Sequence, residues 1–182
     1  MTMENQAPPP DPKALVELFY SDKNLFGTYV EQAECDLTET SRRLLSHNHH
    51  MTVTVEEYHG SLVDVKVLET RTDDRFYSRK ILLTRQSDDR VVQFGIVRLD
   101  LESIDVPVRD QILNQQTPLG RILIQNNVLR RVELSSLWKI TTGEDLSTCC
   151  DVPVEHDLFG RTAWIYCNGK PAVELLEVVT DS

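Results

Sequence analysis

The chain has 182 residues, which fits a single domain long enough to build a hydrophobic core without disulfide bonds. Its 19 Lys and Arg against 29 Asp and Glu give a formal net charge of -10. That balance opposes nucleic-acid binding, which depends on basic side chains that neutralise phosphates. No apolar run is long enough to cross a membrane, and no secretory signal begins the chain. We therefore expect a cytoplasmic protein with no nucleic-acid or membrane partner, and its oligomeric state stays open.

The N-terminal region divides into a tail and the start of one domain. Residues 1–10 are polar and rich in proline, which predicts a disordered tail, and residues 11–182 are expected to form a single domain. Asp11 and Pro12 supply an N-cap and a first-turn proline, so a short helix should begin there. A second helix is predicted near residues 38–45.

Further along the chain the hydrophobic pattern alternates mainly with a period of two, which predicts strands. Expected strands cover residues 51–60, 61–70, 75–85, 90–101, 128–140, 162–167 and 171–179, and expected helices cover 105–116 and the segment that follows Thr117. Asn168-Gly169 is a typical hairpin turn before the final strand. The polar segment 141–157 is long enough to act as a flap. The fold class is therefore α+β: an antiparallel sheet of about six strands with helices packed around it.

The segment Thr117-Pro118-Leu119-Gly120-Arg121 has the pattern of a helix start. Thr117 is the expected N-cap and Pro118 the first helical residue, which leaves the amides of Leu119 and Gly120 without partners inside the helix. Free amides at a helix N-terminus bind carboxylates and phosphates. An ordinary capped helix would explain the same pattern, so the segment is one candidate anion site.

Arg79 is a second candidate. Alternation along its strand places it on the face that carries Tyr77, Ile81 and Leu83, whereas Lys80 projects to the opposite face. A guanidinium on a largely apolar face needs an anionic partner. That partner is either a carboxylate of the protein or a ligand.

Glu177 is a third candidate, because it interrupts the apolar row formed by Val173, Leu175 and Val179. A carboxylate in such a row is costly unless it is paired or protonated, and residues of this kind are enriched at active sites. Glu174 lies on the opposite face of the same strand. An ion pair between Arg79 and a glutamate would account for both residues without any ligand.

The three histidines His47, His49 and His50 suggest a metal site at first sight, but no Cys, Asp or Glu at ligand spacing completes a set. No glycine-rich phosphate loop and no serine nucleophile motif is present. The sequence therefore predicts neither a metal nor an organic cofactor.

Several of these motifs stand together in an order that resembles the chorismate lyase family. They are RFYSRKILL at 75–83, Phe94-Gly95, TPLGR at 117–121, Arg131, LFGR at 158–161 and NGKP at 168–171, so the likeness spans roughly Arg75 to Val179. Glu177 lies six residues after Pro171, which resembles the branch found in cyanobacteria and actinobacteria. A slip in the strand would favour Glu174 instead.

The resemblance implies a buried, water-poor pocket that needs no cofactor. By analogy, the Arg79 side chain and the Leu119 amide, with that of Gly120 beside it, hold the ring carboxylate of the substrate. Glu177 faces the ring oxygen as an acid or base, while the amide of Thr40 and the side chain of Arg131 join the substrate site.

The implied function is a carbon–oxygen lyase that eliminates pyruvate from chorismate and leaves 4-hydroxybenzoate. Two alternatives remain. A hydroxybenzoate synthase that makes another isomer would use nearly the same pocket. Ligand-binding domains of the UTRA type, found in bacterial transcription regulators, are similar in fold but only bind small molecules. Such regulators carry an N-terminal winged helix, whereas the residues before the predicted sheet are few and not basic here, so the sequence favours the enzyme.

Overall fold

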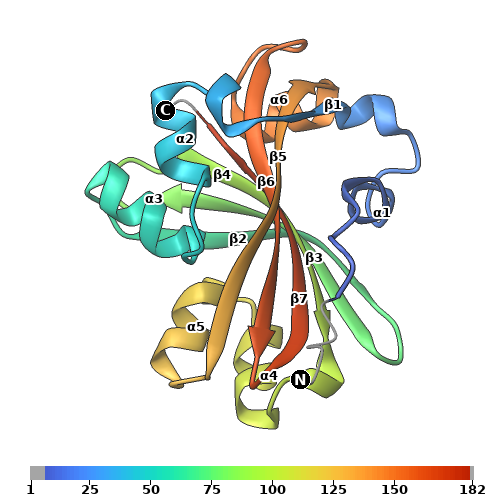
Figure 1. Cartoon of the computed structure of the whole chain (residues 1–182), viewed down its shortest axis with the longest axis vertical. Coiled ribbons are helices and arrows are strands. Elements are labelled where there is room, and N and C mark those ends of the chain that lie inside the picture. The colour runs from blue at the N-terminus through green and yellow to red at the C-terminus, as the bar shows by residue number, and fades with distance from the viewer. Residues whose placement is uncertain (1–6, 181–182) are drawn as a thin grey trace.

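A computed structural model describes residues 7–180, in which seven strands form one antiparallel sheet in the order β1-β5-β6-β7-β4-β3-β2 (Figure 1). The strands are β1 (Gly27–Gln32), β2 (Val63–Thr72), β3 (Phe76–Arg85), β4 (Val91–Asp100), β5 (Arg130–Thr142), β6 (Asp157–Cys167) and β7 (Lys170–Val179). The α-helices are α1 (Pro12–Glu17), α2 (Glu39–Leu45), α3 (Met51–His59), α4 (Val106–Leu113), α5 (Leu119–Gln125) and α6 (Glu144–Cys150). Short 3-10 turns occur at Lys23–Leu25, Glu34–Asp36 and Leu101–Ser103. The predicted α+β class is confirmed.

The two faces of the sheet are covered by different helices. In Figure 1, α2, α3 and α5 lie on one side of the twisted sheet and α1 lies on the other. Leu44, Val55 and Ile122 are fully or almost fully buried on the first side, and Leu15 and Leu146 on the second. Because helices cover both faces, β3 and β4 are buried along most of their length.

The hairpin at the end of the sheet forms as the sequence predicts. Asn168 and Gly169 both have positive φ, at 51° and 80°, and they join β6 to β7 in antiparallel register. Positive φ at both central residues is what a two-residue hairpin with native strand twist requires. A bulge follows the turn, because Tyr166 pairs with Pro171 whereas Ile165 pairs with Val173. The turn and this bulge together set which face of β7 each later side chain occupies.

The prediction of a strand at 51–60 is wrong, because residues Met51–His59 form α3. Alternating Thr and Val favour a strand locally, but Met51, Thr52 and Val55 are buried with helical spacing. The helix ends at Gly60, whose φ of 61° is the left-handed conformation common at helix C-termini. Tertiary packing has overridden the β propensity of this segment.

The polar segment 141–157 is not a flap over the candidate site. Its centre forms α6, with Leu146 and Cys150 one helical turn apart and both buried in the cluster that contains Leu15. A helix anchored in this way is part of the fold. The rest of the segment continues β5 and begins β6.

Two features at the N-terminal end differ from expectation. The expected disordered tail at residues 1–10 falls partly outside the described residues, but Pro10 is buried and Trp164 Nε1 donates a 2.8 Å hydrogen bond to the carbonyl oxygen of Pro8. The edge strand β1 was not predicted. Gly27 lies so close to the Thr141 carbonyl that a Cβ there would overlap it, so β1 pairs tightly with β5. Within residues 7–180, no helix is long and apolar enough to span a membrane.

Candidate functional site

A small cavity lies between the sheet and the N-terminal ends of α3 and α5, with a volume of about 30 Å³. The residues that line it come from five strands and two helix starts: His50, Met51, Thr52, Arg79, Ile81, Leu83, Gln93, Val97, Pro118, Leu119, Gly120, Val132, Arg161, Ile165, Leu175 and Glu177. Because this volume is close to that of one water molecule, a ring-sized ligand requires the walls to move apart. Most of the wall is apolar, and a small number of polar side chains interrupt it.

Arg79 is fully buried in this wall, at 0% exposure. None of its three side-chain nitrogens has a hydrogen-bond partner among the described residues. Burial lowers the pKa of the guanidinium, and the nearby Tyr77 side chain acts in the opposite direction. A buried charge without a partner is costly, and buried polar groups are nearly always hydrogen-bonded. The cavity therefore holds a buried guanidinium that pairs with no carboxylate among the described residues.

The amides of Leu119 and Gly120 belong to the first turn of α5, which lines the same cavity. The helix begins one residue later than predicted: Pro118 occupies the N-cap position and makes no side-chain cap, so Thr117 is not the cap. A Cβ at Gly120 would press on His50 and Thr52 at 3.1 Å, so glycine lets α5 approach the start of α3. Two helix N-termini therefore face the cavity beside Arg79.

Glu177 also lines the cavity, and its partner is Arg161 rather than Arg79. Arg161 Nε donates to Glu177 Oε2 at 2.8 Å, and both side chains are buried. The other guanidinium nitrogens of Arg161 donate to the carbonyl oxygens of His47 and His49, each at 2.9 Å. This arginine thus fixes the carboxylate and ties the segment before α3 to the sheet.

The alternative carboxylate, Glu174, faces away from the cavity. It forms an ion pair with Arg98 at 3.3 Å on the opposite face of β7. Burial raises the pKa of Glu174, while Arg98 opposes that shift. Glu177, and not Glu174, therefore lies on the face of the sheet that lines the cavity with Arg79.

Gln93 contributes a further polar group that the sequence analysis did not identify. Its side chain is almost fully buried, and its amide oxygen has no hydrogen-bond partner among the described residues. Gln93 lies on the same face of β4 as Val97, so a polar residue in an otherwise apolar row was the signal in the sequence. The same signal was present for Arg161, which shares a face of β6 with Ala163 and Ile165.

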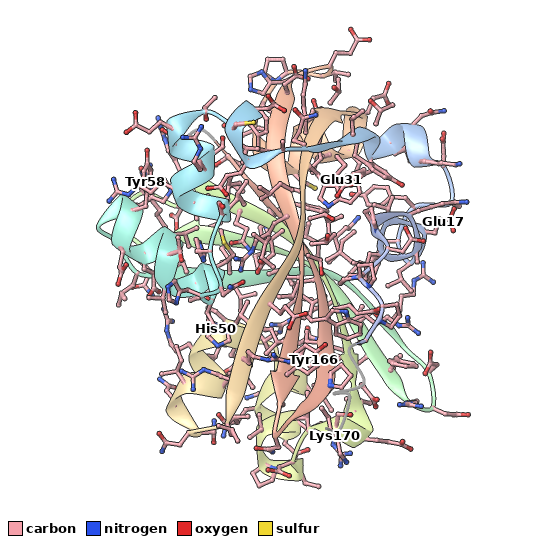
Figure 2. The ribbon with its side chains drawn as sticks, in the orientation of Figure 1. Glu17, Glu31, His50, Tyr58, Tyr166 and Lys170 are labelled. Atoms are coloured by element: carbon pink, nitrogen blue, oxygen red, sulfur yellow. The ribbon has the colours of Figure 1, made fainter. Side chains whose placement is uncertain are left out.

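A larger groove of about 980 Å³ adjoins the cavity, and His50 and Val132 line both. Arg130 Nε donates to His50 Nε2 at 2.9 Å, which holds the imidazole between the two spaces. Figure 2 shows His50 beside β5, on the side of the sheet where α3 and α5 lie.

Two expected site residues do not line the cavity. Arg131 lines the adjoining groove rather than the cavity; it is exposed, pairs with Glu133 at 3.4 Å and places its guanidinium over the Tyr166 ring. Thr40 is half-buried within α2. The structure therefore brings together Arg79, Leu119, Gly120 and Glu177, but neither Arg131 nor Thr40.

The neighbouring histidines carry lowered pKa values. Burial, with Arg161 nearby, lowers the pKa of His47 to about 4, and burial with Arg130 and Arg161 lowers that of His50 to about 4. Both imidazoles are therefore neutral at pH 7, and the buried cations near them are arginines. No group of three metal-ligating side chains occurs within residues 7–180.

Comparisons with known proteins identify the fold but no family. No family model matches the chain, and no curated protein matches it. PhnF from Mycobacterium smegmatis is similar in structure, with 10% identity and a TM-score of 0.56 over 71% of this chain and 63% of PhnF. The effector domain of PhnF gives 8% identity and a TM-score of 0.55 over 73% of this chain and 89% of that domain.

A third similar structure is the ligand-binding domain of a protein assigned to the GntR family of transcriptional regulators, from Bordetella bronchiseptica. It shows 10% identity and a TM-score of 0.52 over 66% of this chain and 86% of that domain. At these identities the likeness shows the fold alone. The fold is chorismate lyase-like, as in the ligand-binding domains of such regulators.

Proposed function

We propose that the cavity binds a small ring carboxylate, with the carboxylate on Arg79. The observation that carries this proposal is a fully buried guanidinium that pairs with no carboxylate within residues 7–180, in a wall that also holds the first amides of α5. An Arg fork and helix-terminal amides together suit a carboxylate better than a neutral group. The alternative that an Arg79–glutamate pair explains both residues fails, because Glu177 pairs with Arg161.

The reaction that best fits these residues is the elimination of pyruvate from chorismate. In that reaction the bond between the ring carbon and the enolpyruvyl oxygen breaks, the neighbouring ring carbon loses a proton, and the released enolpyruvate takes up a proton. The ring becomes aromatic, so the substrate supplies the driving force. The protein has only to hold the dianion in the reactive geometry and assist the proton movement.

Glu177 is the residue that we assign to the proton movement. It lines the same cavity as Arg79 and is held in place by Arg161. The guanidinium holds the carboxylate in one orientation, in which it can accept a hydrogen bond or a proton from the substrate. The ordered motifs that resemble those of the chorismate lyase family support the same assignment.

A ligand-binding module without turnover is the second candidate, and the fold comparisons favour it. Two of the three similar structures are an effector domain and a ligand-binding domain, and a fold of this kind hosts both binding and catalysis. The two candidates share the carboxylate site. They differ only in whether chemistry follows binding.

Incubation of the purified chain with chorismate separates the two candidates. We expect release of equimolar pyruvate and 4-hydroxybenzoate, undiminished in excess chelator, with Arg79→Ala as the control for contaminating activity. Saturable binding of chorismate without pyruvate release would assign the chain to the binding module. Release of pyruvate with another hydroxybenzoate isomer would identify a synthase of that isomer.

A further inference from the structure

The amide of Gln93 is a buried polar group of the cavity that the proposed reaction does not use. Its oxygen has no hydrogen-bond partner within residues 7–180, although the side chain is only 2% exposed. A buried amide without a hydrogen bond costs free energy, and such groups in native structures have a reason, often a missing ligand. Gln93 lines the same cavity as Arg79.

The register of the sheet separates Gln93 from Arg79 along the cavity. Arg79 pairs with Val97 on β4, and Gln93 lies four residues further along that strand, which is about 13 Å of extended backbone. Gly95 lies between them on the same face, and the Ile81 side chain packs against it. A ring whose carboxylate sits on Arg79 and whose plane follows this face of the sheet has its far edge on the side of Gln93.

From this arrangement we infer that Gln93 hydrogen-bonds a hydroxyl group on the ligand ring, at the end opposite the carboxylate. A hydroxyl both donates and accepts, so it can pair with either end of a carboxamide. The inference rests on the proposed carboxylate site and narrows its ligand class to hydroxylated ring carboxylates. Gln93 is thus a specificity-determining residue. An analogue without the hydroxyl would leave the Gln93 amide unpaired in the complex and should therefore bind with lower affinity.

Glu177 is the neighbouring group that could recognise the same hydroxyl. It pairs with Gly95 across the strands, so it lies between the two ends of the cavity. Its Oε2 already accepts from Arg161, whereas the Gln93 oxygen accepts from no residue that the structure describes. The unpartnered amide is therefore the better match for a new donor.

The test compares 4-hydroxybenzoate with benzoate, which differ only in the hydroxyl, by calorimetry on the full chain at pH 7. We expect the unmodified protein to bind 4-hydroxybenzoate about 3- to 10-fold more tightly, the range for one neutral hydrogen bond. Gln93→Met removes the amide with little change in length and should abolish this preference while benzoate still binds. Gln93→Leu serves as a second variant. Gln111→Met, an exposed glutamine on α4, should keep the full preference.

A second measurement separates recognition from a structural role. Removal of an unpaired buried amide should raise the melting temperature of the ligand-free Gln93→Met variant. A lower melting temperature together with an unchanged preference would overturn the inference, as would a preference lost in Glu177→Gln but kept in Gln93→Met. Equal binding of both ligands to the unmodified protein would overturn the inference and leave the carboxylate site intact. If neither ligand binds, the proposed function itself fails.

Discussion

Arg79 and Lys80 are consecutive residues of β3, yet their environments differ in one decisive respect. Lys80 projects to the face covered by α1 and α6, where it contacts Asp145 at 3.4 Å, Glu69 at 3.6 Å and the ring of Tyr20. Arg79 projects to the opposite face and contacts no acidic partner among residues 7–180. Both side chains are buried. Of the two buried cations, only the one in the cavity lacks a protein partner, and that difference locates the candidate site.

The largest expected effect comes from a comparison of two glutamates on opposite faces of β7, where Glu177 shares the face of Arg79 and Glu174 the face of Lys80. Glu177→Gln keeps the size of the side chain but removes its charge, so it should lower kcat for pyruvate release by about 10²–10⁴, the usual contribution of an acid–base group. Glu174→Gln, on the face of Arg98, should leave kcat almost unchanged. Steady-state kinetics on both variants would measure the contrast. A slower Glu174→Gln would mean that β7 is turned in solution, and no effect from either variant would mean that positioning alone drives the reaction.

Next in size is the loss of ligand affinity when Arg79 is removed. Arg79→Ala should cost roughly 2–5 kcal/mol of binding free energy for 4-hydroxybenzoate, the range for one partner of a desolvated charge pair. Arg79→Lys should recover only part of it, because an ammonium cannot reproduce the planar fork. Calorimetric titration measures both. Unchanged affinity in Arg79→Ala would remove the carboxylate site from this cavity.

The stability of the ligand-free protein should respond in opposite directions to the same change on the two faces. Arg79→Met replaces an unpaired buried charge by an apolar chain and should raise the free energy of unfolding by about 1–3 kcal/mol. Lys80→Met loses two partly exposed ion pairs and should lower it by about 1 kcal/mol. Denaturant unfolding gives both values. A destabilised Arg79→Met would indicate a structural role for this arginine.

A smaller effect should appear on acidification. Folding lowers the pKa of both His47 and His50 to about 4, so the unfolded chain takes up protons below about pH 6.5 before the folded chain does. The contribution of the two histidines to the free energy of unfolding is therefore complete above that pH and is lost progressively as the pH falls toward 4. Between pH 7 and pH 5 we expect a loss of about 1–3 kcal/mol from the pair. The double variant His47→Gln/His50→Gln should flatten this slope, and a slope that does not change would assign the acid sensitivity to other groups.

Much of the fold could be predicted from local pattern. The strands around Arg79 and Glu177 follow from alternation of apolar and polar residues. The turn at Asn168-Gly169 follows from the tolerance of these two residue types for the positive φ that they adopt. The prediction of a strand at 51–60 was wrong because β-branched residues are compatible with a helix when one side of it is well packed. Gly60, which ends the helix in the left-handed conformation, was the signal for a helix in this segment. The edge strand β1 had no strong period of its own and forms through pairing with β5.

For the candidate site, the sequence alone determined which side chains share a face. Arg79 and Glu177 break apolar rows, and because a strand alternates strictly, their faces follow from their positions. The choice of partner was decided only by the tertiary structure. Glu177 pairs with Arg161, which lies on another strand, and the pairing depends on register and on a segment before α3 whose carbonyls accept from the same guanidinium. The isolation of Arg79 and of the Gln93 amide likewise comes from what the surrounding strands and helices fail to place beside them.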